Sequence, residues 1–224
     1  MSAAPRCYRD RRQAGRVLAT RLAPELGGRS DLLVLALPRG GVPVAAEVAA
    51  ALEAPLDVFV VRKLGLPTRP ELAMGAIATG GALVVTELAS QLGVSHDDLA
   101  EVIAREQAEL ARRERAYRGR RAPPDPRGRT VVLVDDGLAT GATMLAAVEA
   151  LQRVGARSIV VAAPVGSASA CSMLAHEVYL VVCPHVPDPF RAVGFAYDEF
   201  DAVTDDEVRA VLDAAREPAV RAPT

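Results

Sequence analysis

The stretch of sequence that decides the fold is Val131-Val132-Leu133-Val134-Asp135-Asp136-Gly137-Leu138-Ala139-Thr140-Gly141-Ala142-Thr143-Met144. Its first four residues form a continuous apolar run, which is typical of a strand covered on both faces in a parallel sheet. From Met144 onward the apolar residues return to helical spacing. We therefore predict a strand, a short loop and a helix, with the polar chemistry at the carboxyl end of the strand.

The loop after this strand has the composition of a phosphate site beside a hydroxyl-binding site. Residues 140–143 offer backbone N–H groups, two hydroxyls and little bulk at the positive end of a helix, which suits a phosphate. Carboxylates accept hydrogen bonds, so Asp135 and Asp136 suit neighbouring hydroxyls, such as the 2- and 3-hydroxyls of a ribose. The loop is a candidate site for a phosphorylated sugar.

Other phosphate-binding loops fit this stretch less well. A nucleoside-triphosphate loop needs Gly-x4-Gly-Lys-Ser/Thr, and the dinucleotide fingerprint is Gly-x-Gly-x-x-Gly; neither pattern is present here. An ordinary strand-turn-helix with acidic capping residues is the simpler alternative. Two adjacent acids followed by Thr-Gly-x-Thr favour a ligand site over that alternative.

Residues 132–143 resemble the phosphoribosyl-pyrophosphate motif of type I phosphoribosyltransferases. In that family the paired acids hold the ribose and the Thr-Gly-x-Thr loop holds the 5-phosphate. The resemblance implies the first role for Asp135 and Asp136 and the second for residues 140–143. It also implies 5-phosphoribosyl 1-pyrophosphate as donor, Mg²⁺ as cofactor and a small nitrogenous compound as acceptor.

A second loop, Leu37-Pro38-Arg39-Gly40-Gly41-Val42, follows an earlier apolar run. Arg39 supplies a cation, and Gly40 permits a tight turn that presents backbone N–H groups, which suits pyrophosphate. A plain glycine turn is the alternative. Type I enzymes carry their pyrophosphate loop here, often with a cis peptide before the cationic residue, so the resemblance predicts a cis bond between Pro38 and Arg39.

A pair of cations, Arg62 and Lys63, ends the second predicted strand, and Lys63 is the only lysine in the chain. A compact ammonium suits a phosphate-directed point charge, although chance retention explains it as well. In several phosphoribosyltransferases a basic pair here begins a flexible catalytic loop. The resemblance therefore predicts catalytic roles for Arg39, Arg62 and Lys63, and a mobile lid over residues 64–81 that excludes water.

Residues 186–198 resemble the base-covering hood of hypoxanthine-guanine phosphoribosyltransferases. The resemblance implies that Phe190 stacks on the acceptor and that Asp198 lies near magnesium, which it would contact through water or pyrophosphate. Alternatively, Phe190 closes a small satellite core. Two departures argue against hypoxanthine or guanine as acceptor: Ala139 replaces an acid of that branch, and residues 162–165 replace its purine-reading lysine.

The order of apolar runs predicts an α/β fold with a parallel sheet of about five strands flanked by helices. We expect one domain over residues 1–224, with a core at about 30–183 and a small hood from 1–29 and 184–215. The predicted strands are 32–37, 56–61, 130–134, 158–165 and 178–183. A long charged helix runs from Ser95 to about Tyr117, and its terminal arginines are expected to be solvated, with a dimer contact or an RNA patch as alternatives.

The bulk properties describe one globular domain acting on a small partner. Hydrophobic residues make up 50% of the 224 and the net charge is −2, which argues against non-specific nucleic-acid binding. The chain has no 18-residue apolar run and no signal-like start, so we expect a cytoplasmic protein that binds no membrane. The three cysteines and three histidines lack metal-ligand spacing, and reduced thiols are expected.

The sequence leads to a magnesium-dependent transfer of a phosphoribosyl group to a nitrogenous acceptor, by a protein that we expect to be a homo-oligomer, specifically a dimer. Two alternatives remain open. The same site would serve a non-catalytic regulatory protein that binds a phosphoribosyl compound or nucleotide, and it would serve a hydrolase acting on a phosphoribosyl compound.

Overall fold

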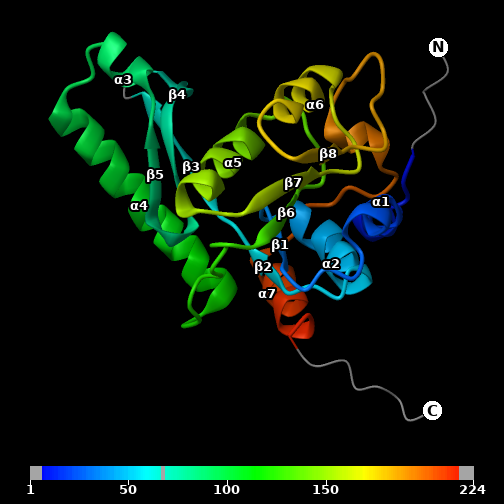
Figure 1. The fold of residues 1–224 in the computed structure, drawn as a ribbon. Coiled ribbons are helices and arrows are strands. Elements are labelled where there is room, and N and C mark those ends of the chain that lie inside the picture. The colour runs from blue at the N-terminus through cyan, green and yellow to red at the C-terminus, as the bar shows by residue number, and fades with distance from the viewer. Residues whose placement is uncertain (1–6, 67–68, 217–224) are drawn as a thin grey trace, which may run out of the picture.

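The computed structural model describes residues 7–66 and 69–216 as an α/β fold (Figure 1). Its central sheet has five strands in the order β2-β1-β6-β7-β8, all paired in parallel. These strands are β1 (Leu32–Ala36), β2 (Leu56–Val58), β6 (Thr130–Val134), β7 (Ser158–Ala162) and β8 (Leu180–Val182). The predicted fold class, a parallel sheet of about five strands flanked by helices, is confirmed.

Alternate residues of the central strands enter two different hydrophobic cores. Val132 and Val134 of β6 pack in one core with side chains from α1 (Arg11–Leu26), α2 (Gly41–Ala51) and α7 (Asp205–Ala214). Val131 and Leu133 pack in the other core with α5 (Ala142–Val154) and α6 (Ala168–Ala175). Because helices cover both faces of the sheet, every residue of β6 is buried, which accounts for its unbroken apolar sequence.

The strand order reverses at the carboxyl ends of β1 and β6, and we call this edge of the sheet the crevice. From β1 the chain crosses through α2 to β2 on one side, whereas from β6 it crosses through α5 to β7 on the other. The two strands are neighbours, with Ala36 opposite Val134 at their last paired position. Ligands of open α/β sheets bind where the strand order reverses in this way. The loops that begin at residues 37 and 135 therefore open onto one crevice.

A second, antiparallel sheet lies beside the first, in the order β3-β4-β5 (Figure 1). It consists of β3 (Val61–Leu66), β4 (Arg69–Ala78) and β5 (Ala82–Val85), with a short 3₁₀ turn at Thr79–Gly81. The helices α3 (Glu87–Gln91) and α4 (His96–Arg118) follow it, and α4 and α5 both pack against the sheet.

Residues 64–81, which the resemblance predicts to form a mobile lid, belong mainly to the strands β3 and β4 among the residues that the structure describes, and the lid itself stays a prediction. Leu64, Met74 and Ile77 are buried in the apolar core, and residues 67–68 lie outside the described part. Glycine does not prevent strand formation in this segment. A Cβ at Gly75 would lie 2.2 Å from the Val84 carbonyl oxygen, so this glycine permits close strand pairing and does not mark a loop.

The hood joins two segments that are far apart in the sequence. The backbone N–H of Tyr8 donates to the Ala196 carbonyl at 2.9 Å, and the N–H of Asp198 donates to the Tyr8 carbonyl at 2.9 Å. A short 3₁₀ helix, η2 (Val193–Ala196), lies in this region. A small apolar core beneath it contains Tyr8, Ala14, Val165, Ala196 and Tyr197.

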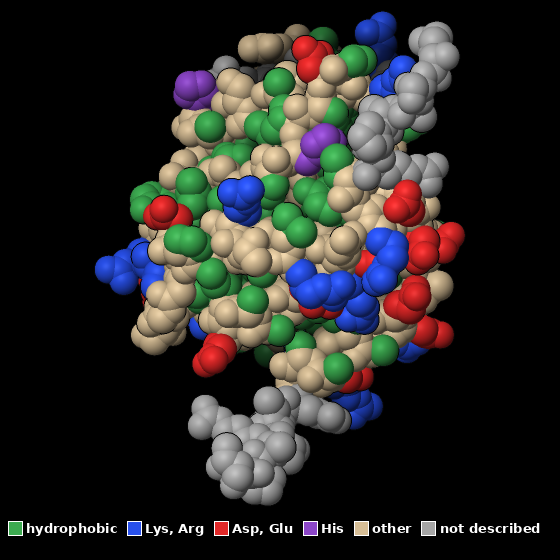
Figure 2. Space-filling model, turned by 90° about the vertical axis from the view of Figure 1, so that its right-hand side faces the viewer, with side chains coloured by type: hydrophobic (Ala, Val, Ile, Leu, Met, Phe, Trp, Pro, Cys, Tyr) green, Lys and Arg blue, Asp and Glu red, His purple; other side chains and the backbone are tan. Residues whose placement is uncertain are grey.

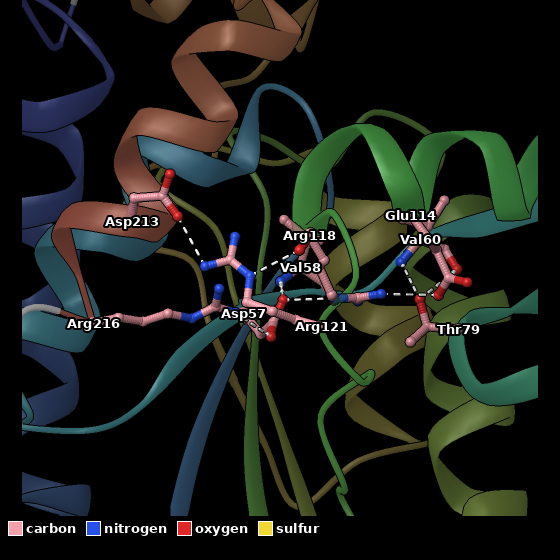
Figure 3. A network of polar contacts seen from close by, with 9 residues as sticks. All are labelled: Asp57, Val58, Val60, Thr79, Glu114, Arg118, Arg121, Asp213 and Arg216. Carbon is pink, nitrogen blue, oxygen red and sulfur yellow. Dashed lines mark hydrogen bonds and ion pairs between the residues drawn. The ribbon is translucent and has the colours of Figure 1, made fainter.

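An ion network, buried at Arg118 and Asp57, links the end of α4 to β2 and to the end of α7 (Figure 3). The Arg118 side chain is 2% exposed, and its Nε donates to Asp57 Oδ1 at 2.8 Å. Arg216 Nη2 donates to the other Asp57 oxygen, also at 2.8 Å, and Arg121 Nη1 donates to Asp213 Oδ1. The expectation of a solvated arginine cluster is therefore wrong for Arg118, because the carboxylate on β2 draws its side chain inward.

Charges of both signs are mixed on the face of the molecule that carries α1 (Figure 2). On this helix the Nη1 atoms of Arg12 and Arg16 both lie 3.4 Å from Glu47 Oε1 of α2. Among the described residues, no helix combines the length and the apolar composition that crossing a bilayer requires.

Candidate active site

The two predicted loops meet in the crevice between β1 and β6. A Cβ added at Gly40 would lie 2.1 Å from Asp136 Oδ2, and one added at Gly41 would lie 2.7 Å from the Val134 carbonyl oxygen. Only glycine allows the first loop to come this close to the twin acids. The peptide between Pro38 and Arg39 is cis, as the resemblance predicts.

The twin acids have different partners. Asp135 Oδ1 accepts a hydrogen bond from the Asp136 backbone N–H at 2.8 Å. Asp136 Oδ2 accepts one from Arg11 Nε at 2.8 Å, and the Tyr197 hydroxyl donates to the Asp136 backbone carbonyl at 2.6 Å. The sequence pattern did not indicate that Arg11 and Tyr197 contact Asp136, because they lie 125 and 61 positions away from it; Arg11 belongs to no motif, and Tyr197 lies in the hood stretch with no role assigned to it.

Burial changes the acidity of both carboxyl groups. It raises the pKa of Asp135 well above its ordinary value, and the negative charge of Asp136 raises this pKa further. Burial also raises the pKa of Asp136, but the hydrogen bond and charge of Arg11 oppose the increase. The pair therefore holds its protons more tightly than exposed aspartates do.

We expect the stability of the ligand-free protein to fall as the pH rises through the raised pKa of Asp135. The folded state binds this proton more tightly than the unfolded state, whose pKa is about 3.9. The stability that the raised pKa of Asp135 contributes is complete below about pH 4, and it is lost as this carboxyl group ionises in the folded protein. Urea unfolding of the wild type and of Asp135→Asn at a series of pH values measures the difference. Identical pH dependence in the two proteins would contradict the prediction.

The phosphate loop lies at the amino end of α5. Gly141 is the N-cap of this helix and has a φ of 75°, a left-handed conformation that favours glycine. The Thr140 and Thr143 side chains are exposed, and the first-turn N–H groups of a helix lack intrahelical partners, so both groups can meet an anion. The Ser167 hydroxyl donates to the Ala139 carbonyl at 2.6 Å and supports the loop from behind.

Gly141→Ala is expected to lower the free energy of unfolding by about 1–2 kcal/mol and to weaken ribose 5-phosphate binding. The left-handed backbone accounts for the loss of stability. The new Cβ would lie 2.8 Å from Met173 Cε, whose flexible side chain can turn away, and 3.2 Å from Ala170 Cβ on α6, which pushes against the loop. Gly155→Ala is the matched control, because Gly155 has a φ of 92° at the other end of α5 and its nearest neighbour would be 3.9 Å away. Urea unfolding and calorimetric titration distinguish the two variants; equal ribose 5-phosphate affinities would contradict the loop's role.

The three predicted catalytic cations, Arg39, Arg62 and Lys63, lie in different surroundings. Arg39 is half-exposed, and its Nη1 lies 3.5 Å from Asp205 Oδ1 at the start of α7. Arg62 and Lys63 do not end the second strand as predicted, because β2 ends at Val58 and both residues lie in β3. Arg62 Nη2 donates to Glu106 Oε2 of α4 at 2.6 Å, and Lys63 is exposed.

The two predicted hood residues lie in different surroundings. Phe190 is partly buried and packs against the hood core, where Tyr8 and Tyr197 lie. Asp198 is exposed and directly follows Tyr197, whose hydroxyl contacts the acid loop. The hood therefore reaches the crevice through Tyr197.

Twin acids and a helix amino end at a reversal of strand order define a class of α/β proteins that bind phosphorylated ligands at that edge. The sequence profile of the phosphoribosyl transferase domain matches residues 69–199, more than half of the chain, including the whole loop from Asp135 to Thr143. The chain belongs to the phosphoribosyl transferase domain family. The family predicted from the motif is confirmed.

Two relatives from Mycobacterium tuberculosis, named "Putative phosphoribosyl transferase" MT0597 and Rv0571c, are each 47% identical to the chain over 212 residues. These residues are 93% of this chain and 47% of each relative, so the chain spans about half the length of these relatives. The crystal structure of TT1426 from Thermus thermophilus is 45% identical and covers 92% of this chain and 97% of its own, with a TM-score of 0.82.

Proposed function

We propose that this chain transfers a phosphoribosyl group from 5-phosphoribosyl 1-pyrophosphate to a nitrogenous acceptor and releases pyrophosphate, in a magnesium-dependent reaction. The observation that carries the proposal is the contact between Gly40 and Asp136. This contact places a cation-bearing turn, two carboxylates and the amino end of α5 around one crevice. These are the groups that a doubly phosphorylated sugar requires.

Each part of the donor has a partner in this arrangement. The 5-phosphate would lie against residues 140–143, and the ribose hydroxyls would donate to Asp135 and Asp136. As the bond to pyrophosphate breaks, positive charge develops on the sugar ring and negative charge on the leaving group, which Arg39 stabilises. The Arg39 contact with Asp205 is long and half-exposed, so pyrophosphate can compete for this cation. The acids contribute by orienting the sugar.

Magnesium fits this site as an ion held mainly by the substrate. Within residues 7–66 and 69–216, no three or more His, Cys, Asp or Glu side chains form a group able to hold a metal. Mg²⁺ is commonly bound through substrate phosphates and only one or two carboxylates. Asp198 would contact it through water or pyrophosphate, and the ion would neutralise charge on the leaving group.

The acceptor-facing residues argue for a compound other than a 6-oxopurine. Ala139 is exposed and offers no proton acceptor from its side chain, and the segment at residues 162–165 contains no cation. We propose Phe190 as the face against which the acceptor stacks, which requires its exposed part to turn toward the crevice.

Calorimetric titration of 5-phosphoribosyl 1-pyrophosphate with and without Mg²⁺, followed by pyrophosphate release with a panel of purines, pyrimidines and pyridines, tests the proposal. We expect Mg²⁺ to tighten binding and release to require an acceptor. Donor binding without pyrophosphate release for any acceptor would instead indicate a regulatory protein. Formation of free ribose 5-phosphate without an acceptor would indicate a hydrolase. Absence of donor binding would remove the proposal.

A further inference from the structure

One acid of the pair is held by a cation from the hood. Arg11, the first residue of α1, donates from Nε to Asp136 Oδ2 at 2.8 Å. The two side chains are only 11% and 15% exposed. An ion pair this well shielded from water is stronger than a surface pair, and removing one partner leaves a charge that is poorly solvated.

The Arg11 side chain is fixed from three directions. Its Nη1 donates to the Asp201 carbonyl at 2.7 Å, and its Cζ lies 3.9 Å from the centre of the Phe200 ring. Phe200 in turn stacks on Tyr197 with ring centres 5.0 Å apart, and the Tyr197 hydroxyl donates to the Asp136 carbonyl. The hood therefore holds both the side chain and the backbone of Asp136.

The charged and titratable groups around Asp136 come from every neighbouring element. Asp135 lies beside it on the same loop, Arg11 faces it from α1 and the Tyr197 hydroxyl faces it from the hood, while the Gly40 backbone covers it from the first loop. The charge of Arg11 also favours the ionised form of Glu207 on α7. Arg11 bonds Asp136 directly and acts on Asp135 only through its charge, which favours ionisation of Asp136 over Asp135.

We propose that Arg11 is a positioning residue that keeps Asp136 as the ionised member of the acid pair and turns its other oxygen, Oδ1, toward a ribose hydroxyl. The hood then controls donor affinity through this one contact. When the hood moves away, Asp136 loses its cation, takes up a proton more readily and binds a hydroxyl less well. This inference rests on the proposed function for the identity of the ligand.

Carboxyl-carbon NMR of the ligand-free protein tests the electrostatic step. We expect the pKa of Asp136 to rise in Arg11→Gln and to return toward the wild-type value in Arg11→Lys, which keeps the charge. Arg12→Gln is the matched control, because it removes the neighbouring charge on α1, whose side chain is 58% exposed and faces Glu47. An unchanged Asp136 titration in Arg11→Gln would overturn the inference.

Calorimetric titration with ribose 5-phosphate across a pH series, without Mg²⁺, tests the ligand step. We expect Arg11→Gln to bind about tenfold more weakly near neutral pH, the equivalent of about 1.4 kcal/mol, with its binding midpoint shifted to higher pH. An affinity loss of the same size at every pH would assign a merely structural role and overturn the inference. If the wild type bound neither ribose 5-phosphate nor 5-phosphoribosyl 1-pyrophosphate, the proposed function would fail, while the NMR titration would still decide what Arg11 does to Asp136.

Discussion

Replacing Asp135 and Asp136 together by Asn is expected to weaken 5-phosphoribosyl 1-pyrophosphate binding by about 100-fold or more. A hydrogen bond to a charged group contributes about 1.5–3 kcal/mol, and each 1.4 kcal/mol is a factor of ten. The double variant removes the charge of Asp136 and the carboxyl group of Asp135 while keeping the size of each side chain. Calorimetric titration in the presence of Mg²⁺ measures the effect, and turnover with any acceptor found should fall with it.

A second pair of adjacent acids gives the control for this variant. Asp97 and Asp98 lie exposed in the first turn of α4, so their replacement by Asn makes the same double substitution outside the crevice. We expect that control to bind the donor like the wild type. Unchanged donor affinity in the Asp135/Asp136 variant, with an intact fold, would show that the twin acids do not hold the ribose.

Arg118→Met is expected to lower the free energy of unfolding by about 3–5 kcal/mol. Removing one partner of a buried ion pair leaves the other charge poorly compensated, and here Asp57 would keep only Arg216, whose side chain is 30% exposed. For a chain of this size such a loss lowers Tm by roughly 6–20 °C. Thermal and urea unfolding measure it.

Two further variants show whether the ion pair is responsible. Arg120→Met makes the same substitution at an exposed position two residues later and should change stability little. Adding Asp57→Asn to Arg118→Met should recover part of the loss, because the amide oxygen can still accept the 2.7 Å hydrogen bond from the Val58 N–H without burying a charge. A double variant less stable than Arg118→Met alone would contradict this account.

The parallel sheet and its crevice were predictable because burial on both faces leaves a readable pattern. Each central strand of the sheet appears as an apolar run, and the loop chemistry follows directly at its end. The position of both loops at one edge of the sheet also followed, since parallel strands have their carboxyl ends there; the contact between Gly40 and Asp136 was not predicted. Local sequence was sufficient for the sheet and for the position of its loops.

The misplaced and missed residues depend on long-range packing. The apolar run at residues 56–61 continues through Phe59 and Val60, which are buried, so nothing local shows that one strand ends and another sheet begins before Arg62. Arg118 lies among several arginines near the end of α4, and nothing in the local sequence shows that its side chain pairs with the distant Asp57. Arg11 reaches Asp136 only because the folded hood brings α1 to the loop.

The pairing of Tyr8 with Tyr197 has a consequence for the order of events during synthesis. A polypeptide leaves the ribosome from its amino end, so Tyr8 emerges long before the partner that it meets in the finished hood. The loops after β1 and β6 can come together once residue 143 has emerged, whereas the pairing that forms the hood requires residues 196–198. The nascent protein would therefore bring the two loops together before its hood can form.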